Sequence, residues 1–243
     1  METFRTIYLF YSNLPGCLIK IERQKMKNLD CILFDFDYTL ADSSNGIIEC
    51  MGHAFRKLGL PEPDPVEIRK AIGKSLPETF ELFTGHNCTK TVNEFRKLFR
   101  ARADQIMADQ TYIYEPVPKV IEILQQYRLG IVSTKFSYRI REILEREMLE
   151  KYFELIIGGE NVSKNKPDPE GLLLALEKLN AAKDRAIYIG DSQVDAETAK
   201  RARISFIAVL TGVTERHQFR NYDVLEFIDD LSQLPALISD FSS

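Results

Sequence analysis

Short apolar runs that alternate with amphipathic segments are the feature that most restricts the fold of this 243-residue chain. Each run is long enough for one buried strand. The runs lie at 30–35, 129–133, 153–157, 186–190 and 204–210, and the amphipathic segments lie at 117–127, 137–149, 169–179 and 193–203. Regular alternation of strands and helices is typical of parallel sheets. We therefore predict an α/β fold, a Rossmann-like parallel sheet with helices on both faces.

The segment 44–112 interrupts this alternation, because its pattern is helical throughout and it contains no convincing strand. Phe95, Phe99 and Ile106 recur there at helical spacing. A helical block inserted directly after the first strand is expected to lie over the carboxyl edge of the sheet, as an all-helical cap domain. The predicted domains are a catalytic core of 26–43 and 113–243 and a helical cap of 44–112.

Residues 1–25 are expected to be an N-terminal extension with little role in the fold, because Met26 directly precedes the first strand and is an alternative natural start. No apolar run approaches the roughly 20 residues that a membrane-spanning helix needs, so we expect no membrane partner. The formal net charge of −4 gives no electrostatic case for binding nucleic acid.

The four cysteines, Cys17, Cys31, Cys50 and Cys88, are scattered along the chain. They form neither a CxxC pair nor the spacing of zinc ligands. We therefore expect free thiols in a protein of the reducing cytoplasm.

Two carboxylates, Asp35 and Asp37, stand where the buried run 31–34 ends. A charge at the end of a buried strand is costly unless a partner compensates it. A metal ion is a natural partner, because the carboxyl ends of the strands are where open α/β sheets bind their ligands.

Other polar residues follow three more of the predicted strands: Ser133 with Thr134, Lys166, and Asp191 with Asp195. Each has a plain structural explanation by itself, such as a helix cap for Ser133 or a solvated loop for Lys166. Parallel strands would nevertheless bring all of them to the edge that carries Asp35. Carboxylates, an ammonium group and a hydroxyl suit phosphoryl transfer assisted by Mg²⁺, which prefers hard oxygen ligands.

Four motifs resemble those of the haloacid dehalogenase-like hydrolase superfamily, near its phosphoglycolate phosphatase and β-phosphoglucomutase group. They are DFDYT at 35–39, the Ser133 region, Lys166 before a proline, and GDSQVD at 190–195. The resemblance extends from about residue 29 to residue 210. In this family pattern, Tyr38 stands where glycine is most frequent, and Thr134 stands where asparagine often follows the motif hydroxyl.

The resemblance implies that Asp35 is the nucleophile and Asp37 the general acid and base. It also implies a Mg²⁺ site formed by Asp35, the main-chain carbonyl of Asp37, and Asp191. Asp195 would support that site, directly or through water.

For the phosphate, the resemblance implies that Ser133 binds the phosphoryl oxygens, with Thr134 as the alternative hydroxyl. Lys166 would orient both the nucleophile and the phosphate. A carboxylate at position 37 can also activate the water that removes the phosphate from Asp35, which favours turnover over a long-lived phosphoenzyme.

In related enzymes the loop that corresponds to 72–76 enters the active site. Lys74 is therefore a candidate ligand of a substrate carboxylate or phosphate, with Gly73 allowing the loop to bend. The alternative is a glycine that ends a helix beside a solvated lysine. Arg56, Arg96 and Arg100 are expected to form part of the solvated face of the cap helices.

The sequence therefore predicts a Mg²⁺-dependent phosphatase that acts on a small phosphorylated metabolite, similar to phosphoglycolate or a sugar phosphate. A phosphomutase of the β-phosphoglucomutase type would use the same active site. A non-catalytic ligand-binding or regulatory protein on this scaffold is disfavoured by the complete set of Asp35, Asp37, Lys166 and Asp191. A dehalogenase needs no metal, so the paired acidic motifs argue against it.

Overall fold

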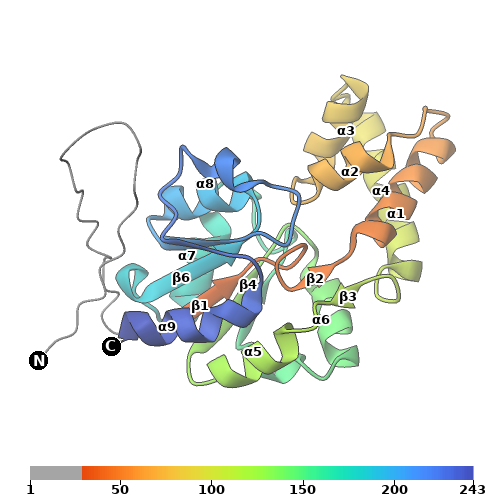
Figure 1. Cartoon of the computed structure of the whole chain (residues 1–243). Helices are drawn as coiled ribbons and strands as arrows, with labels where there is room; N and C mark the ends of the chain where they lie inside the picture. Colours follow the sequence, from red (N-terminus) through yellow and green to blue (C-terminus); the bar gives the residue numbers. More distant parts are fainter. Residues whose placement is uncertain (1–28, 243) are drawn as a thin grey trace, which may run out of the picture.

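A six-stranded parallel sheet forms the centre of the protein, whose computed structural model describes residues 29–242 (Figure 1). The strands lie in the order β5-β4-β1-β6-β7-β8. Their bounds are β1 Cys31–Phe34, β4 Arg128–Val132, β5 Leu155–Ile157, β6 Ala186–Gly190, β7 Ser205–Val209 and β8 Glu226–Ile228. The fold class and all five predicted strands are confirmed. The expected extension 1–25 and Cys17 lie outside the described residues.

Helices cover both faces of this sheet because successive side chains of a strand point to opposite faces. One face is covered by α5 (Val117–Leu124), α6 (Ser137–Arg146) and α9 (Leu234–Ser242), and the other by α7 (Glu170–Lys178) and α8 (Gln193–Ala202) (Figure 1). In β1, Ile32 and Phe34 join the first apolar layer, whereas Cys31 and Leu33 join the second. Short 3-10 turns occur at Glu150–Tyr152, Lys183–Arg185, Arg216–Phe219 and Leu231–Gln233.

Four helices form the separate lobe at the upper right of Figure 1: α1 Ser44–Lys57, α2 Pro65–Ala71, α3 Leu76–Thr84 and α4 Thr89–Ile106. The lobe has its own apolar cluster, in which the Phe95 ring contacts those of Phe80 and Phe55 at centroid distances of 4.9 and 5.7 Å. This lobe is the all-helical cap that the sequence predicts.

The chain enters the cap through β2 (Ala41–Asp42) and leaves it through β3 (Tyr112–Ile113), and these two short strands pair antiparallel. Tyr112 therefore belongs to a strand, although it lies in the segment 44–112, which is expected to contain none. A two-residue strand carries too little alternation to be recognised in a sequence. The exact domain boundaries stay a prediction.

The register of the strands aligns their carboxyl ends. Phe34 pairs with Ile131 of β4 and with Ile189 of β6, and the Asp35 amide donates to the Ile189 carbonyl at 2.8 Å. The loops that follow β1, β4 and β6 therefore begin side by side. Among the residues that the structure describes, no helix combines the length and apolar character needed to cross a membrane.

Candidate active site

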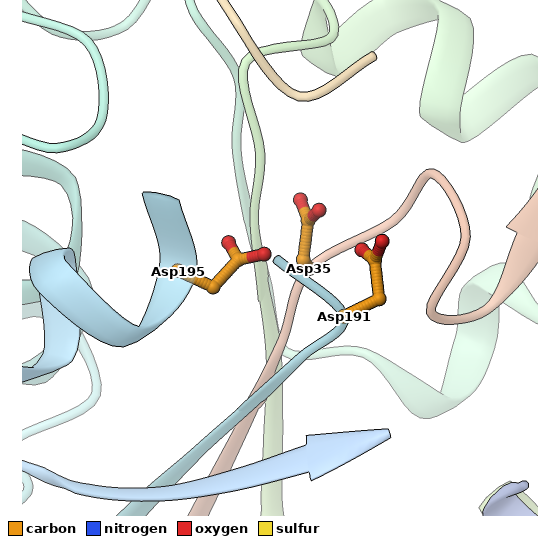
Figure 2. A group of neighbouring side chains, drawn as sticks. All are labelled: Asp35, Asp191 and Asp195. Carbon is orange, nitrogen blue, oxygen red and sulfur yellow. The ribbon is translucent and has the colours of Figure 1, made fainter. Parts of the chain in front are cut away.

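Three buried carboxyl groups meet at this edge of the sheet. Asp35 follows β1, Asp191 follows β6, and Asp195 lies in the first turn of α8 (Figure 2). One oxygen of each lies within 4.8 Å of the others, and the three residues are at most 4% exposed. Burial, opposed in part by Lys166, raises the pKa of Asp35 to about 6. Burial and the charges of Asp195 and Asp35 likewise raise the pKa of Asp191 well above its usual value.

This cluster fits a divalent cation. Lys166 is the only ammonium group paired with it among the described residues, so negative charge is left in excess in a buried place. Oδ1 of Asp35 is buried, and its ion-pair contact with Lys166 lacks good hydrogen-bonding geometry. Hard carboxylate oxygens are the ligands that Mg²⁺ prefers. Asp35 and Asp191 are therefore suited to hold such an ion.

Lys166 connects two members of the cluster. Its Nζ lies 2.8 Å from Asp35 Oδ1 and 2.6 Å from Asp195 Oδ1. Burial lowers the pKa of Lys166, but the charges of Asp195 and Asp35 outweigh it and raise this pKa overall. The lysine therefore stays protonated, and its ammonium group fixes the direction of the Asp35 carboxylate.

Asp195 has no free oxygen for a further partner. Oδ1 accepts from Lys166 and from the Tyr188 hydroxyl, at 2.6 and 2.9 Å. Oδ2 accepts from the amide of Ser192, at 3.1 Å, and from its hydroxyl, within the capping box that begins α8. A direct bond to a metal would cost Asp195 some of these contacts. Its geometry favours an indirect role, in which it holds Lys166 in place.

Asp37 is paired with Lys135, a residue that the sequence analysis assigns no function. Nζ of Lys135 lies 2.9 and 3.1 Å from the two oxygens of Asp37, and both side chains are buried. The carboxyl group of Asp37 is thus engaged away from the acidic cluster. Lys135 follows the predicted Ser133-Thr134 pair directly, which is the only signal in the sequence that could have indicated it.

Of the hydroxyl residues after β4, Ser133 is buried, and its Oγ accepts from the Lys135 amide at 3.3 Å. The Thr134 hydroxyl donates to the Gly73 carbonyl of the cap at 3.3 Å. Gly73 has a φ of +96°, a conformation that favours glycine. The cap loop therefore bends towards the core, and Lys74 in that loop is exposed.

A cavity of about 440 Å³ lies between the cap and the core. Its walls include Asp37, Thr134 and Lys135 from the core, and Gly73 and Lys74 from the cap. The cavity therefore reaches the loop after β1 at Asp37, whereas Asp35, Lys166 and Asp191 are not among the residues that line it.

Two cap arginines are placed differently from the expectation. Arg96 and Arg100 line the cavity, whereas Arg56 pairs with Glu62 at the surface, 2.6 Å away, as expected of a solvated face. The expectation is wrong for Arg96 and Arg100, because the face of α4 that carries them turns towards the core. A helical pattern cannot show which domain lies opposite a polar face.

Tyr38 has a φ of 63°, the left-handed conformation in which a side chain costs about 1 kcal/mol. Its side chain is only 5% exposed, so apolar burial offsets this cost. The hydroxyl lies near Ser44 and Arg69 at the base of the cap, without good hydrogen-bonding geometry to a described residue. Tyr38 thus connects the loop after β1 with the cap, which accounts for a bulky residue where glycine is common.

The loop after β7 also borders the site, although none of the predicted site residues lies in it. The Thr211 hydroxyl donates to the Tyr38 carbonyl. A Cβ atom at Gly212 would lie 2.0 Å from Oδ2 of Asp191. Gly212 is therefore required for the present position of the Asp191 carboxylate. Its position two residues after a predicted strand is the only signal in the sequence.

The parallel sheet, the buried carboxylates at its carboxyl edge and the helical lobe above them define a capped α/β enzyme with an acidic active site. A family model described as haloacid dehalogenase-like hydrolase matches residues 32–209. The chain belongs to this family of hydrolases, as the resemblance of its motifs implies.

Similar proteins include phosphatases. Pyrophosphatase PpaX from Listeria monocytogenes serotype 4b (strain CLIP80459) is 32% identical over 213 residues, which cover 86% of this chain and 96% of that protein. Phosphoglycolate phosphatase from Aquifex aeolicus (strain VF5) is 32% identical over 183 residues, which cover 74% and 84%. A crystal structure from Bacteroides fragilis, described as a haloacid dehalogenase-like hydrolase, has a TM-score of 0.83 and 40% identity, covering 86% of this chain and all of that one.

Gly212→Ala is expected to lower the catalytic rate of the enzyme by about 100-fold, because its methyl group displaces the Asp191 carboxylate and a displacement of about 1 Å can cost that much. The thermal unfolding midpoint should change little, since a side chain rather than backbone has to move. Steady-state kinetics and thermal unfolding of the purified variant test this. An unchanged rate would show that the position of Asp191 is not critical.

Proposed function

We propose that the protein is a Mg²⁺-dependent phosphatase that hydrolyses a small phosphorylated metabolite through an aspartyl-phosphate at Asp35. The observation that carries this proposal is the placement of the Asp35 carboxylate. It is buried, 2.8 Å from the Lys166 ammonium and beside Asp191, at the end of β1. The names of the two similar phosphatases, which describe pyrophosphate and phosphoglycolate as substrates, support a small phosphorylated substrate.

In the first step, an Asp35 oxygen forms a bond to phosphorus while the bond from phosphorus to the leaving oxygen breaks. Asp37, two residues away on the same loop, gives its proton to the leaving oxygen. Lys166 holds the Asp35 carboxylate in its direction of attack. Its ammonium group also offsets negative charge on the phosphoryl group.

In the second step, Asp37 takes a proton from water as that water attacks phosphorus, which releases phosphate and restores the Asp35 carboxylate. Because Asp37 exchanges a proton twice in each cycle, Lys135 has to loosen its 2.9 Å ion pair during the reaction. The phosphoryl oxygens are its natural new partners. We therefore add Lys135 to Ser133 and Thr134 as a phosphate-binding residue.

Asp35, the main-chain carbonyl of Asp37, and Asp191 would hold Mg²⁺. When bound, the ion neutralises the excess negative charge of the carboxylates and of the phosphoryl group. Asp195 acts through Lys166, because its own oxygens are already occupied.

The cap supplies the remaining wall of the site. The contact between Thr134 and the Gly73 carbonyl brings the loop that carries Lys74 to the mouth of the cavity. Such a wall excludes water from the phosphoryl group, which strengthens its interactions with the surrounding charges. Lys74 is thereby proposed as a substrate contact.

Asp35→Asn is expected to lower phosphatase activity at least about a thousandfold, because the amide cannot attack phosphorus. The test is phosphate release from a panel of small phosphate esters in the presence of Mg²⁺, with the exposed Asp109→Asn as a matched control that keeps wild-type activity. Wild-type activity in Asp35→Asn would exclude the covalent mechanism. Conversion of a hexose 1-phosphate into its 6-phosphate isomer would instead indicate a phosphomutase.

Mg²⁺ is expected to raise the thermal unfolding midpoint of the wild-type protein, because it binds the folded carboxylate cluster and not the unfolded chain. Asp191→Asn should lose this shift. The metal-free variant should also unfold at a higher temperature than the metal-free wild type, since one buried charge is removed. Thermal unfolding with and without Mg²⁺ measures both effects. An equal Mg²⁺ shift in Asp191→Asn would show that the ion binds elsewhere.

A further inference from the structure

Two arginines in the cavity have no task in the phosphoryl chemistry proposed above. Arg96 and Arg100 lie one turn apart on α4 and project from the same side of that helix. Both line the cavity that also contains Asp37 and Thr134. A leaving group that takes its proton from Asp37 therefore lies in the same cavity as two guanidinium groups of the cap.

Unlike Lys135 and Arg139, which also line the cavity, these arginines have no carboxylate partner among the described residues. Lys135 lies 2.9 Å from Asp37, and Arg139 lies 2.5 Å from Asp104. No carboxylate of the described residues lies within 4 Å of the guanidinium nitrogens of Arg96 or Arg100. The contact of Arg96 with Asn93 is a long one, 3.4 Å.

Arg100 is the more constrained of the two. Its guanidinium carbon lies 4.3 Å from the centre of the Phe136 ring, which fixes the plane of the group. Its Nε is buried and has no hydrogen-bond acceptor among the described residues. Burial, together with the charges of Arg96 and Arg139, lowers the pKa of Arg100. A cation in such surroundings is stabilised by an anion that enters the cavity.

The backbone that carries these arginines is fixed to the core. Arg139 of α6 donates to the Arg100 carbonyl at 3.0 Å and to the Asp104 carboxylate. The Tyr138 hydroxyl also donates to Asp104, at 2.7 Å. The backbone of α4 is therefore held at a set place relative to the core, and the Phe136 ring orients the Arg100 guanidinium on it, as a preorganised binding site requires.

We propose that Arg96 and Arg100 form a second anion subsite, which binds a carboxylate or phosphate group on the part of the substrate that leaves. The proposal rests on the phosphatase function. The substrate is then a short phosphate ester or anhydride with an anionic group at each end. A cavity of about 440 Å³ has room for such a molecule. Arginine suits this task because its planar fork binds both oxygens of a carboxylate or phosphate.

The test compares kcat/KM for substrates with two anionic groups, 2-phosphoglycolate and pyrophosphate, with kcat/KM for ethyl phosphate, which has one. The ratio of interest is kcat/KM for the better doubly anionic substrate divided by kcat/KM for ethyl phosphate. In Arg100→Met this ratio is expected to fall about 10- to 100-fold, the usual effect of losing a charged hydrogen bond. Methionine keeps an apolar chain against Phe136. Lys97→Met, which removes an exposed cation of α4 outside the cavity, should leave the ratio unchanged.

Arg96→Met is a second variant, which keeps the test possible if Arg100→Met does not fold. Its ratio of kcat/KM values should fall in the same way. The preference of the wild type between 2-phosphoglycolate and pyrophosphate distinguishes a carboxylate from a phosphate as the second anion. Unchanged ratios in the folded arginine variants would overturn the subsite. A wild-type protein that hydrolyses none of the three compounds, nor any other phosphate ester, would instead overturn the proposed function.

Discussion

The interaction on which the site depends is the pairing of the buried Lys166 ammonium with two carboxylates, Asp35 and Asp195. Without Lys166, the buried carboxylates would repel one another where little solvent screens their charges. Asp195 anchors the lysine because the start of α8 and Tyr188 hold both of its oxygens. Asp35 is the carboxylate of this pairing that we propose as the nucleophile.

The fold provides this pairing through the alignment of its strands. β1 lies between β4 and β6, so the loops with Asp35, Ser133 and Asp191 begin side by side. The cap is inserted between β2 and β3, next to the same loops. One edge of the sheet thus holds the groups to which we assign the reaction, while the cap contributes walls to the cavity beside them.

Much of this arrangement could be predicted from the sequence. The strands with long apolar runs were predictable, and so were the polar residues that follow them, because a parallel sheet brings strand ends together. β8 was not predicted, because Glu226 interrupts its apolar residues and leaves only Phe227 and Ile228 in a row, whereas β5, of the same length, is apolar throughout. The ion pair of Lys135 with Asp37 and the approach of Gly212 to Asp191 depend on how loops fold over one another. Which face of α4 points into the cavity, and with it the position of Arg100, depends on how the cap packs against the core.

Covalent catalysis by Asp35 is tested most directly by trapping the phosphorylated protein in Asp37→Asn with p-nitrophenyl phosphate. This leaving group departs without a proton, so the first step persists while hydrolysis of the intermediate lacks its base. We predict a burst of p-nitrophenolate equal to the enzyme concentration, and one phosphoryl group on Asp35 in peptides from the acid-quenched protein. A burst without this modification, or a phosphoryl group on another residue, would contradict attack by Asp35.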